Sequence, residues 1–233
     1  MSMTLLRPCV DAPVSKYVIH GFGFDHTSND YKVLRIVFDW DVRFPPQAEI
    51  YKLRTGVWET VRGADDFQNV QCRDTQALVN GASHWLGFHR RDMALVKVVV
   101  LFHMCDEEFR VMKLSDHLSS LCWSDVALGV SGGLLSLMEH NWSDDNLSRW
   151  NVWLMKEYGV VESWTKQFTI DSNGWRFGSM FSFRNNEKIV GEMQDEPVLY
   201  DPKTHAFINL GIKAKGSLFA KNTYVESLVL LNK

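Results

Sequence analysis

The sequence lacks three features that would assign it to a membrane, a nucleic acid or a secretory route. It has no apolar run of about 18 residues, so no segment is expected to span a membrane. Its formal net charge of −3 gives no general attraction to nucleic acid or to an anionic lipid surface. The N-terminal MSMTLLRPCVDAP has no apolar core typical of a signal peptide. We therefore expect a cytoplasmic chain, one that could also enter the nucleus, with its four scattered cysteines reduced.

Clusters that hold metals or carry out catalysis are also scarce. His103 and Cys105 fall on one strand face, with His84 and His89 upstream, but metal sites need three or four converging donors. The GFGF at 21–24 lacks the third glycine and the helix of a dinucleotide site, so we interpret its glycines as points of close backbone packing. We expect no catalytic residue, no cofactor and no metal.

Short apolar runs separated by turn residues fill the chain, together with nine tryptophans. Such runs are typical of β-strands, and bulky rings suit sheets packed on sheets. The best helix candidate, 114–123, fits a single turn. The sequence predicts an all-β fold with strands at 31–38, 95–104, 132–140, 150–155, 179–183 and 226–231, and turns at 80–81, 131–133, 173–174, 184–187 and 201–204.

Aromatic pairs seven residues apart recur along the chain with a turn between them. The leading aromatics are Tyr51, Phe102, Trp153 and Tyr200, and their partners are Trp58, Phe109, Trp164 and Phe207, with four extra residues in the third turn. The leaders are 51, 51 and 47 residues apart.

A second marker keeps step with the aromatic leaders. Gly81, Gly132 and Gly178 precede three of them by 21, 21 and 22 residues, and Gly23 precedes Tyr51 by 28. Chance spacing within an ordinary all-β chain remains the alternative.

A repeat of about 50 residues made only of strands matches one four-stranded blade of a β-propeller. We predict a propeller-like, kelch-type array of four to five four-stranded units. A fifth unit begins at SLFAKNTYVESLVLL, and residues 1–20 are too short to supply a further blade, so an incomplete ring is one outcome of this prediction.

Several linked motifs resemble the F-box-associated domain of plant F-box proteins. They run in order from about residue 20 to the end: YVIHGFGFDHTSNDYKVLRIV, EIYKLRTGVW, ALVNGASHWLGF, VSGGLLSLM, WNVWLMKEYGVVESWTKQFTI and TYVESLVLLN, the last similar to S-locus F-box and S-locus-F-box-like proteins. The resemblance implies that residues 20–233 form this domain behind a lead-in at 1–19, with the F-box itself missing.

In such proteins the F-box docks on a Skp-type adaptor of an SCF (Skp–cullin–F-box) ubiquitin ligase, and the associated domain holds the protein to be ubiquitinated. S-locus members recognise ribonucleases in self-incompatibility. The resemblance thus implies a non-catalytic substrate receptor, with adaptor and cullin as partners only if an F-box lies upstream. Two alternatives stay open: a truncated interaction module without ligase function, and a propeller enzyme with carboxylates or metal ligands at its axis.

Partner-binding residues are expected in the turns. The acidic turn with Asp106 and Glu107 could meet a basic partner such as a cationic ribonuclease, although such turns are commonly just solvated. The 151–166 unit has the longest inner turn, so we select Glu157 and Tyr158 as specificity residues. Trp142 lies beside a polar turn and is a candidate interface anchor, with core packing as the alternative.

Overall fold

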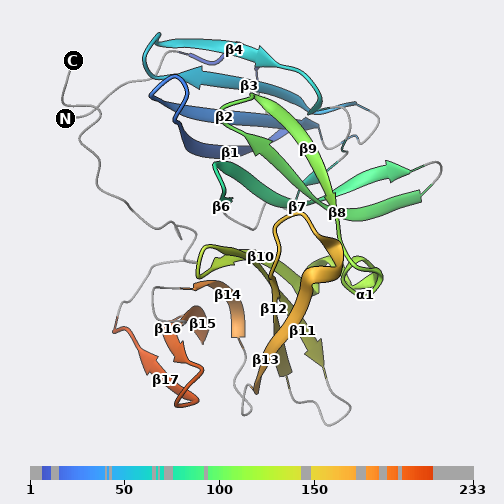
Figure 1. The fold of residues 1–233 in the computed structure, drawn as a ribbon, viewed down its shortest axis with the longest axis vertical. Helices are drawn as coiled ribbons and strands as arrows, with labels where there is room; N and C mark the ends of the chain where they lie inside the picture. Colours follow the sequence, from blue (N-terminus) through green and yellow to red (C-terminus); the bar gives the residue numbers. More distant parts are fainter. Residues whose placement is uncertain are drawn as a thin grey trace.

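The computed structural model describes residues 7–11, 16–39, 41, 44–64, 67, 69–70, 76–91, 94–142, 148–171, 177–183, 188–193 and 196–211. These residues form four antiparallel sheets that follow one another along the chain (Figure 1). The all-β, propeller-like prediction is therefore confirmed. The predicted strand at 226–231 and the predicted turns at 173–174 and 184–187 lie outside the described residues.

Each sheet is built from consecutive strands. The first sheet contains β1 (Lys16–Asp25), β2 (Asp30–Asp39), β3 (Gln47–Lys52) and β4 (Val57–Val61); the second contains β5 (Asn69–Val70), β6 (Ala77–Val79), β7 (Ala82–Arg91), β8 (Ala94–His103) and β9 (Glu108–Lys113). The third contains β10 (Val126–Ser131), β11 (Leu134–Trp142), β12 (Ser148–Met155) and β13 (Trp164–Asp171); the fourth contains β14 (Phe177–Phe183), β15 (Ile189–Met193), β16 (Glu196–Asp201) and β17 (Ala206–Asn209).

The second sheet departs from the predicted four strands, because β5 and β6 both pair with β7. Between the second and third sheets lies α1 (Asp116–Ser120), the single helical turn expected near 114–123. The backbone N–H of Leu118 donates to the side chain of Ser115, which caps this helix.

Three of the four predicted aromatic hairpins are confirmed. Residues facing each other across a hairpin are Tyr51 and Trp58, Phe102 and Phe109, and Tyr200 and Phe207, with ring centroids 5.3, 4.8 and 4.8 Å apart.

The third aromatic pair is wrong. The loop 156–163 closes between Met155 and Trp164, so these two residues face each other, and Trp153, two residues earlier, faces Lys166. A methionine leads this hairpin, which is why an aromatic marker misplaced it.

The four glycines of the second marker do not occupy equivalent positions. Gly81 and Gly132 occupy the turns before β7 and β11 with φ of 73° and 56°, a region that L side chains rarely adopt. Gly23 and Gly178 instead lie within β1 and β14, so they are not equivalent to the turn glycines.

The first two sheets share a core whose closest approach is at β1. A Cβ on Gly21 would lie 3.0 Å from the Trp85 ring, and one on Gly23 would lie 2.7 Å from Cγ of Met104. This confirms that the GFGF glycines permit close packing. The core contains Leu34, Ile36, Phe38, Ile50, Trp85, Val100, Phe102 and Met104. A second core joins Leu86, Val99, Leu101, Leu135, Leu137, Met155 and Trp164 of the second and third sheets.

Residues 7–11 lie against the first sheet, within the segment expected to be a lead-in. The backbone N–H groups of Cys9 and Val10 donate to Oε2 of the buried Glu49 at 2.9 and 3.1 Å. Arg35 forms an ion pair with the other oxygen of this carboxylate and donates to the carbonyl of Val10. β1 begins at Lys16, ahead of the domain start expected at residue 20.

Candidate protein-binding site

In the first three sheets, the turn that leads into β2, β7 or β11 and the turn before the last strand fall at the same end, and in the fourth sheet the turn before the last strand has the equivalent place. We call this the turn end; its described segments are 26–29, 53–56, 80–81, 104–107, 132–133, 156–163 and 202–205. Asp106, Glu107, Glu157 and Tyr158 lie at the turn end of the second and third sheets. Trp142 ends β11 at the opposite end, where it pairs with Ser148, and its side chain lies outside the described part of the chain.

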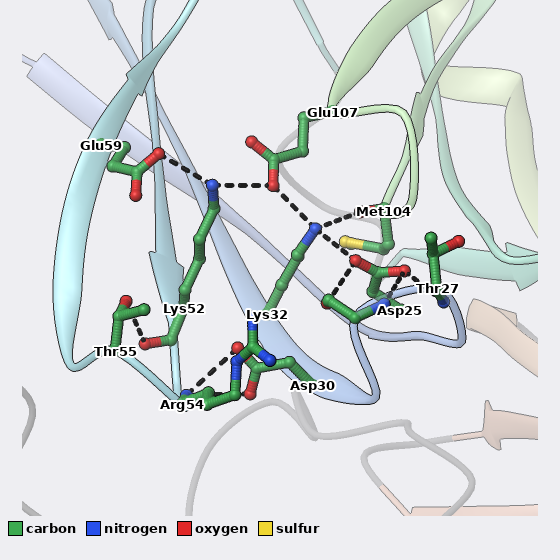
Figure 2. A network of polar contacts seen from close by, with 11 residues as sticks. Asp25, Thr27, Asp30, Lys32, Lys52, Arg54, Thr55, Glu59, Met104 and Glu107 are labelled. Carbon is green, nitrogen blue, oxygen red and sulfur yellow. Dashed lines mark hydrogen bonds and ion pairs between the residues drawn. The ribbon is translucent and has the colours of Figure 1, made fainter.

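Glu107 is held by two lysines of the neighbouring first sheet (Figure 2). Its Oε1 lies 2.7 Å from Nζ of Lys32 and 3.0 Å from Nζ of Lys52. Lys32 is only 3% exposed, and it also pairs with Asp25 at 2.7 Å and donates to the carbonyl of Met104 at 2.8 Å. All three ammonium donors of this lysine are therefore used. The acidic turn thus joins two sheets as well as facing solvent.

The pKa values follow from this pairing. Burial opposes the charged form of Lys32, but hydrogen bonds from its ammonium to Asp25 and Glu107 outweigh burial and raise its pKa. Burial likewise opposes the charged forms of Asp25 and Glu107, yet the lysines hold the pKa of both carboxyl groups below the usual range. The three groups are charged together at neutral pH.

Tyr158 makes the corresponding contact between the second and third sheets. Its hydroxyl lies 2.7 Å from Nε2 of His84, and the two rings meet edge to face at 5.6 Å. The other ring nitrogen of His84 lies 2.9 Å from the carbonyl of Ala77. Burial lowers the pKa of His84 to about 4, so the ring is neutral at physiological pH. The loop chosen for specificity is thus anchored by its own tyrosine.

Asp106 and Glu157 remain accessible beside these anchors. Asp106 is about half exposed and pairs with the equally exposed Arg110 at 3.0 Å. The side chain of Glu157 is exposed, while its backbone N–H donates to Oγ of Ser163 at 3.1 Å, which closes the loop on itself. Partner binding by any of the five selected residues remains a prediction.

Chemistry at this end consists of charge and hydrogen bonding. Among the described residues, no group of three or more His, Cys, Asp or Glu side chains is placed to hold a metal ion. His84 is fully buried and directed at Tyr158 and Ala77. No helix in the described part of the chain is long and apolar enough to cross a membrane.

The family is decided by comparison with known proteins. The model of the F-box-associated β-propeller domain matches residues 6–230. The chain belongs to this family. The F-box-associated domain thus accounts for both the four-sheet architecture and the linked sequence motifs.

Curated relatives of this F-box-associated domain come from Arabidopsis thaliana. F-box protein CPR1 is 26% identical over 92% of this chain and 56% of its own length. Another F-box protein is 24% identical over 92% of the chain and 57% of its own length. An F-box/kelch-repeat protein is 24% identical over 66% of the chain and 40% of its own length. The chain therefore spans about half the length of these two F-box proteins.

Two solved structures overlap the domain in part. YjhT covers 90% of this chain and 71% of its own at 10% identity, with a TM-score of 0.49. The β-propeller domain of the Trilobed protease from Pyrococcus furiosus covers 84% and 67% at 10% identity, with a TM-score of 0.40. At this identity the similarity concerns fold alone.

Sequence reasoning missed Lys32 and His84, the residues that anchor the two selected loops. A signal for both was present. Lys32 shares its strand face with the buried Leu34 and Ile36, and His84 shares its face with the buried Leu86. A polar side chain on the same strand face as buried apolar residues is itself buried, so it needs a polar partner on the neighbouring sheet.

Proposed function

We propose that this chain is the substrate-binding domain of an F-box protein, which acts as the receptor subunit of an SCF ubiquitin ligase. The observation that carries the proposal is the family match over residues 6–230. Ubiquitin transfer belongs to partner subunits, and a receptor contributes proximity rather than acid–base chemistry. Rigid sheets that present turns at their ends suit that role. We also propose that the chain acts in the cytoplasm, and in the nucleus where its target is nuclear.

The test compares the chain alone with the same chain fused behind an F-box. We expect only the fused form to co-purify with a Skp-type adaptor and cullin, whereas both forms capture the same target. Target ubiquitination in a reconstituted ligase should require the fused form. Retention of the adaptor by the chain alone, or target capture by an unrelated propeller, would contradict the proposal.

The alternative is an interaction module that binds its partner without ligase work. Under this alternative, expressing the chain with an intact ligase leaves the captured protein without ubiquitin, and the half-life of that protein does not change. A target that is turned over faster favours the receptor.

We further propose that the partner is recognised through the turns. Asp106, Glu107, Glu157 and Tyr158 would contact it at the turn end, and Trp142 at the opposite end. Exposed acidic side chains at the turn end, including Glu108 and Glu162, favour a basic protein such as a cationic ribonuclease, as in S-locus recognition. Exchanging residues 156–163 with those of a related receptor should change partner choice, and unchanged choice would contradict the assignment.

A further inference from the structure

A polar groove lies on one face of the third sheet, away from the turn end. Its volume is about 390 Å³, and it is lined by Asn141, Arg149, Asn151, Lys166, Thr169 and Asp171 from β11, β12 and β13. Toward the turn end, the same face is apolar: Leu135, Leu137 and Met155 pack there against the second sheet. One face therefore divides into a buried apolar half and an open polar half.

The polar half is built from neighbouring residues on adjacent strands. Asn141 faces Arg149, which in turn faces Asp171, and Nε of Arg149 donates to Oδ1 of Asp171 at 2.9 Å. In the next row Asn151 faces Thr169, whose hydroxyl donates to Oδ1 of Asn151 at 2.7 Å. These side chains restrain one another, so the groove is formed before any ligand arrives.

A buried carboxylate, Glu139, lies next to these rows, opposite Asn151 on the neighbouring strand. Glu139 is 3% exposed, and its Oε2 accepts from Nδ2 of Asn151 at 3.2 Å and from Nε1 of Trp153 at 2.8 Å. Its Oε1 lies 3.4 Å from Nε2 of His117 on α1. Desolvating a carboxylate is costly, and here two hydrogen-bond donors, Asn151 and Trp153, offset that cost. The acceptor capacity of Glu139 is thus used inside the protein.

The groups of the groove that remain available to a ligand are hydrogen-bond donors. Arg149 contacts Asp171 through Nε, which leaves its two terminal amino groups directed elsewhere. Lys166 is exposed, and no ion pair or hydrogen bond joins its ammonium to another described residue. Two cationic donor groups therefore stand on the groove wall while the acidic groups beside them are engaged.

We propose that this groove binds an acidic segment of the partner protein, with a carboxylate side chain held by Arg149 and Lys166. This inference rests on the proposed receptor function and names the chemistry of the segment that is recognised. The terminal amino groups of an arginine match a carboxylate in geometry, and a lysine adds a point charge. Two cationic side chains, one of them paired with Asp171, do not form the row of cations that a nucleic-acid backbone demands. The amide of the exposed Asn141 suits the peptide backbone between acidic side chains.

The experiment measures binding of a fluorescein-labelled peptide of alternating serine and glutamate, and of its glutamine counterpart, by fluorescence anisotropy up to millimolar concentration. We expect the wild-type chain to bind the glutamate peptide at least tenfold more tightly. Arg149→Gln combined with Lys166→Gln should weaken that binding about tenfold. Lys113→Gln together with Lys203→Gln removes the same charge at exposed positions outside the groove and should leave it unchanged. The indole N–H signal of Trp153, assigned with Trp153→Phe, should shift on titration.

Equal binding of the two peptides would overturn the proposal, as would equal weakening by the control pair. A labelled oligothymidylate that binds as tightly and competes would show that the site reads phosphate, which also overturns it. These outcomes concern the groove alone. Adaptor-dependent ubiquitination by the F-box fusion could persist without peptide binding, and its loss in an otherwise peptide-binding chain would count against the receptor function instead.

Discussion

At the scale of single residues, the polar side chains buried between sheets do most to fix how the sheets meet. Lys32 extends from a strand face that is otherwise apolar and reaches a turn 75 positions further along the chain. Leaving such an ammonium unpaired in a buried setting would cost several kcal/mol, roughly 3–5, so its partners matter more than an exposed pair would. The acidic turn is therefore constrained by Lys32 before any partner binds.

Glu107→Gln tests this constraint. The substitution keeps the shape of the side chain and removes the charge between Lys32 and Lys52, so we expect a loss of about 1–3 kcal/mol in the free energy of unfolding. Urea denaturation measures the change. The matched control is Glu108→Gln at the start of β9, directly after this turn. Its carboxylate is 64% exposed and, within the described part of the chain, pairs with Arg110, so the substitution should change stability by less than about 0.5 kcal/mol. Equal effects of the two substitutions would contradict the prediction.

His84 makes stability depend on pH. Its folded pKa of about 4 lies below the ordinary 6.5, so the unfolded chain takes up a proton first as pH falls. Stability contributed by neutral His84 is complete above pH 6.5 and is lost as pH falls from 6.5 toward 4. At about 1.4 kcal/mol for each pH unit, the loss approaches roughly 3 kcal/mol.

The measurement is urea denaturation at several pH values between 4 and 7. The carboxyl groups also titrate near the lower limit, so the informative quantity is the difference between the wild type and His84→Gln. That difference should shrink as pH falls. Parallel curves for the two proteins would show that His84 does not titrate as described.

At the scale of strands and hairpins, the sequence predicts what depends on neighbouring residues. Tyr51 and Trp58 face each other because a tight four-residue turn fixes the register of the hairpin, so a spacing of seven is visible in the sequence. The same reasoning failed at Trp153, because the eight-residue loop 156–163 places Met155 opposite Trp164 and leaves Trp153 opposite Lys166. The contacts of Lys32 and His84, 75 and 74 residues away, depend on how whole sheets pack and leave only the signal of a polar residue on a buried face.

The close approach of β1 to the second sheet gives an element-scale prediction. Gly23→Ala places a methyl group 2.7 Å from Cγ of the fully buried Met104, so β1 must move away or the methionine must repack. We expect a loss of about 1–3 kcal/mol, measured by urea denaturation. Thr60→Ala, on the exposed side of β4, is the control and should be nearly neutral.

A double-mutant cycle of Gly23→Ala and Met104→Ala distinguishes a steric clash from a loss of backbone flexibility at Gly23. If the methyl group clashes with Met104, then Gly23→Ala combined with Met104→Ala should cost less than the sum of the two single changes. Additive losses would show that the backbone, and not the contact with Met104, requires glycine here.

In the β12–β13 loop (residues 156–163), Tyr158 anchors the loop to His84, and the neighbouring Glu157 is an exposed residue that we propose contacts the partner. Tyr158→Phe removes the hydroxyl that meets His84 and keeps the ring, so we expect a loss of about 1 kcal/mol in stability. Glu157→Gln changes an exposed carboxylate next to it and should leave stability within about 0.5 kcal/mol. If the loop contacts a basic partner, Glu157→Gln should instead weaken partner capture. Both variants are measured by urea denaturation and by pull-down of the partner. If Glu157→Gln destabilised the chain and left partner capture intact, the assignment of Tyr158 to stability and Glu157 to binding would be wrong.

At the scale of the whole molecule, the contacts between sheets follow the repeat. Lys32, His84 and Ser136 are each the third residue of the strand that follows the first turn of the turn end in their unit, namely β2, β7 and β11, and successive members are 52 residues apart. The first two reach a turn of the following sheet, at Glu107 and Tyr158. The fourth sheet carries His205 where the second carries Glu107, both two residues before an aromatic and both with φ near +55° (55° and 57°).

The third of these contacts is missing in the described part of the chain. Nδ1 of His205 lies 2.9 Å from the hydroxyl of Tyr200 in its own hairpin, and Oγ of the fully buried Ser136 has no hydrogen-bond partner. The junction between the third and fourth sheets therefore lacks, among the described residues, the polar contact that joins the first sheet to the second and the second to the third. Lys32, His84 and Ser136 therefore occupy the same position at the three described junctions between neighbouring sheets, and the effects of substituting them on stability can be compared.

Alanine at that position tests the comparison. Lys32→Ala leaves Asp25 and Glu107 without their shared partner, and His84→Ala leaves a cavity beside Tyr158, so each should cost more than about 2 kcal/mol. Ser136→Ala removes a buried hydroxyl that bonds none of the described residues, so stability should stay constant or rise by up to about 1 kcal/mol. Urea denaturation of the three variants measures this order. A loss above about 1 kcal/mol for Ser136→Ala would mean that its hydroxyl finds a partner in solution, and that the third junction is joined as the first two are.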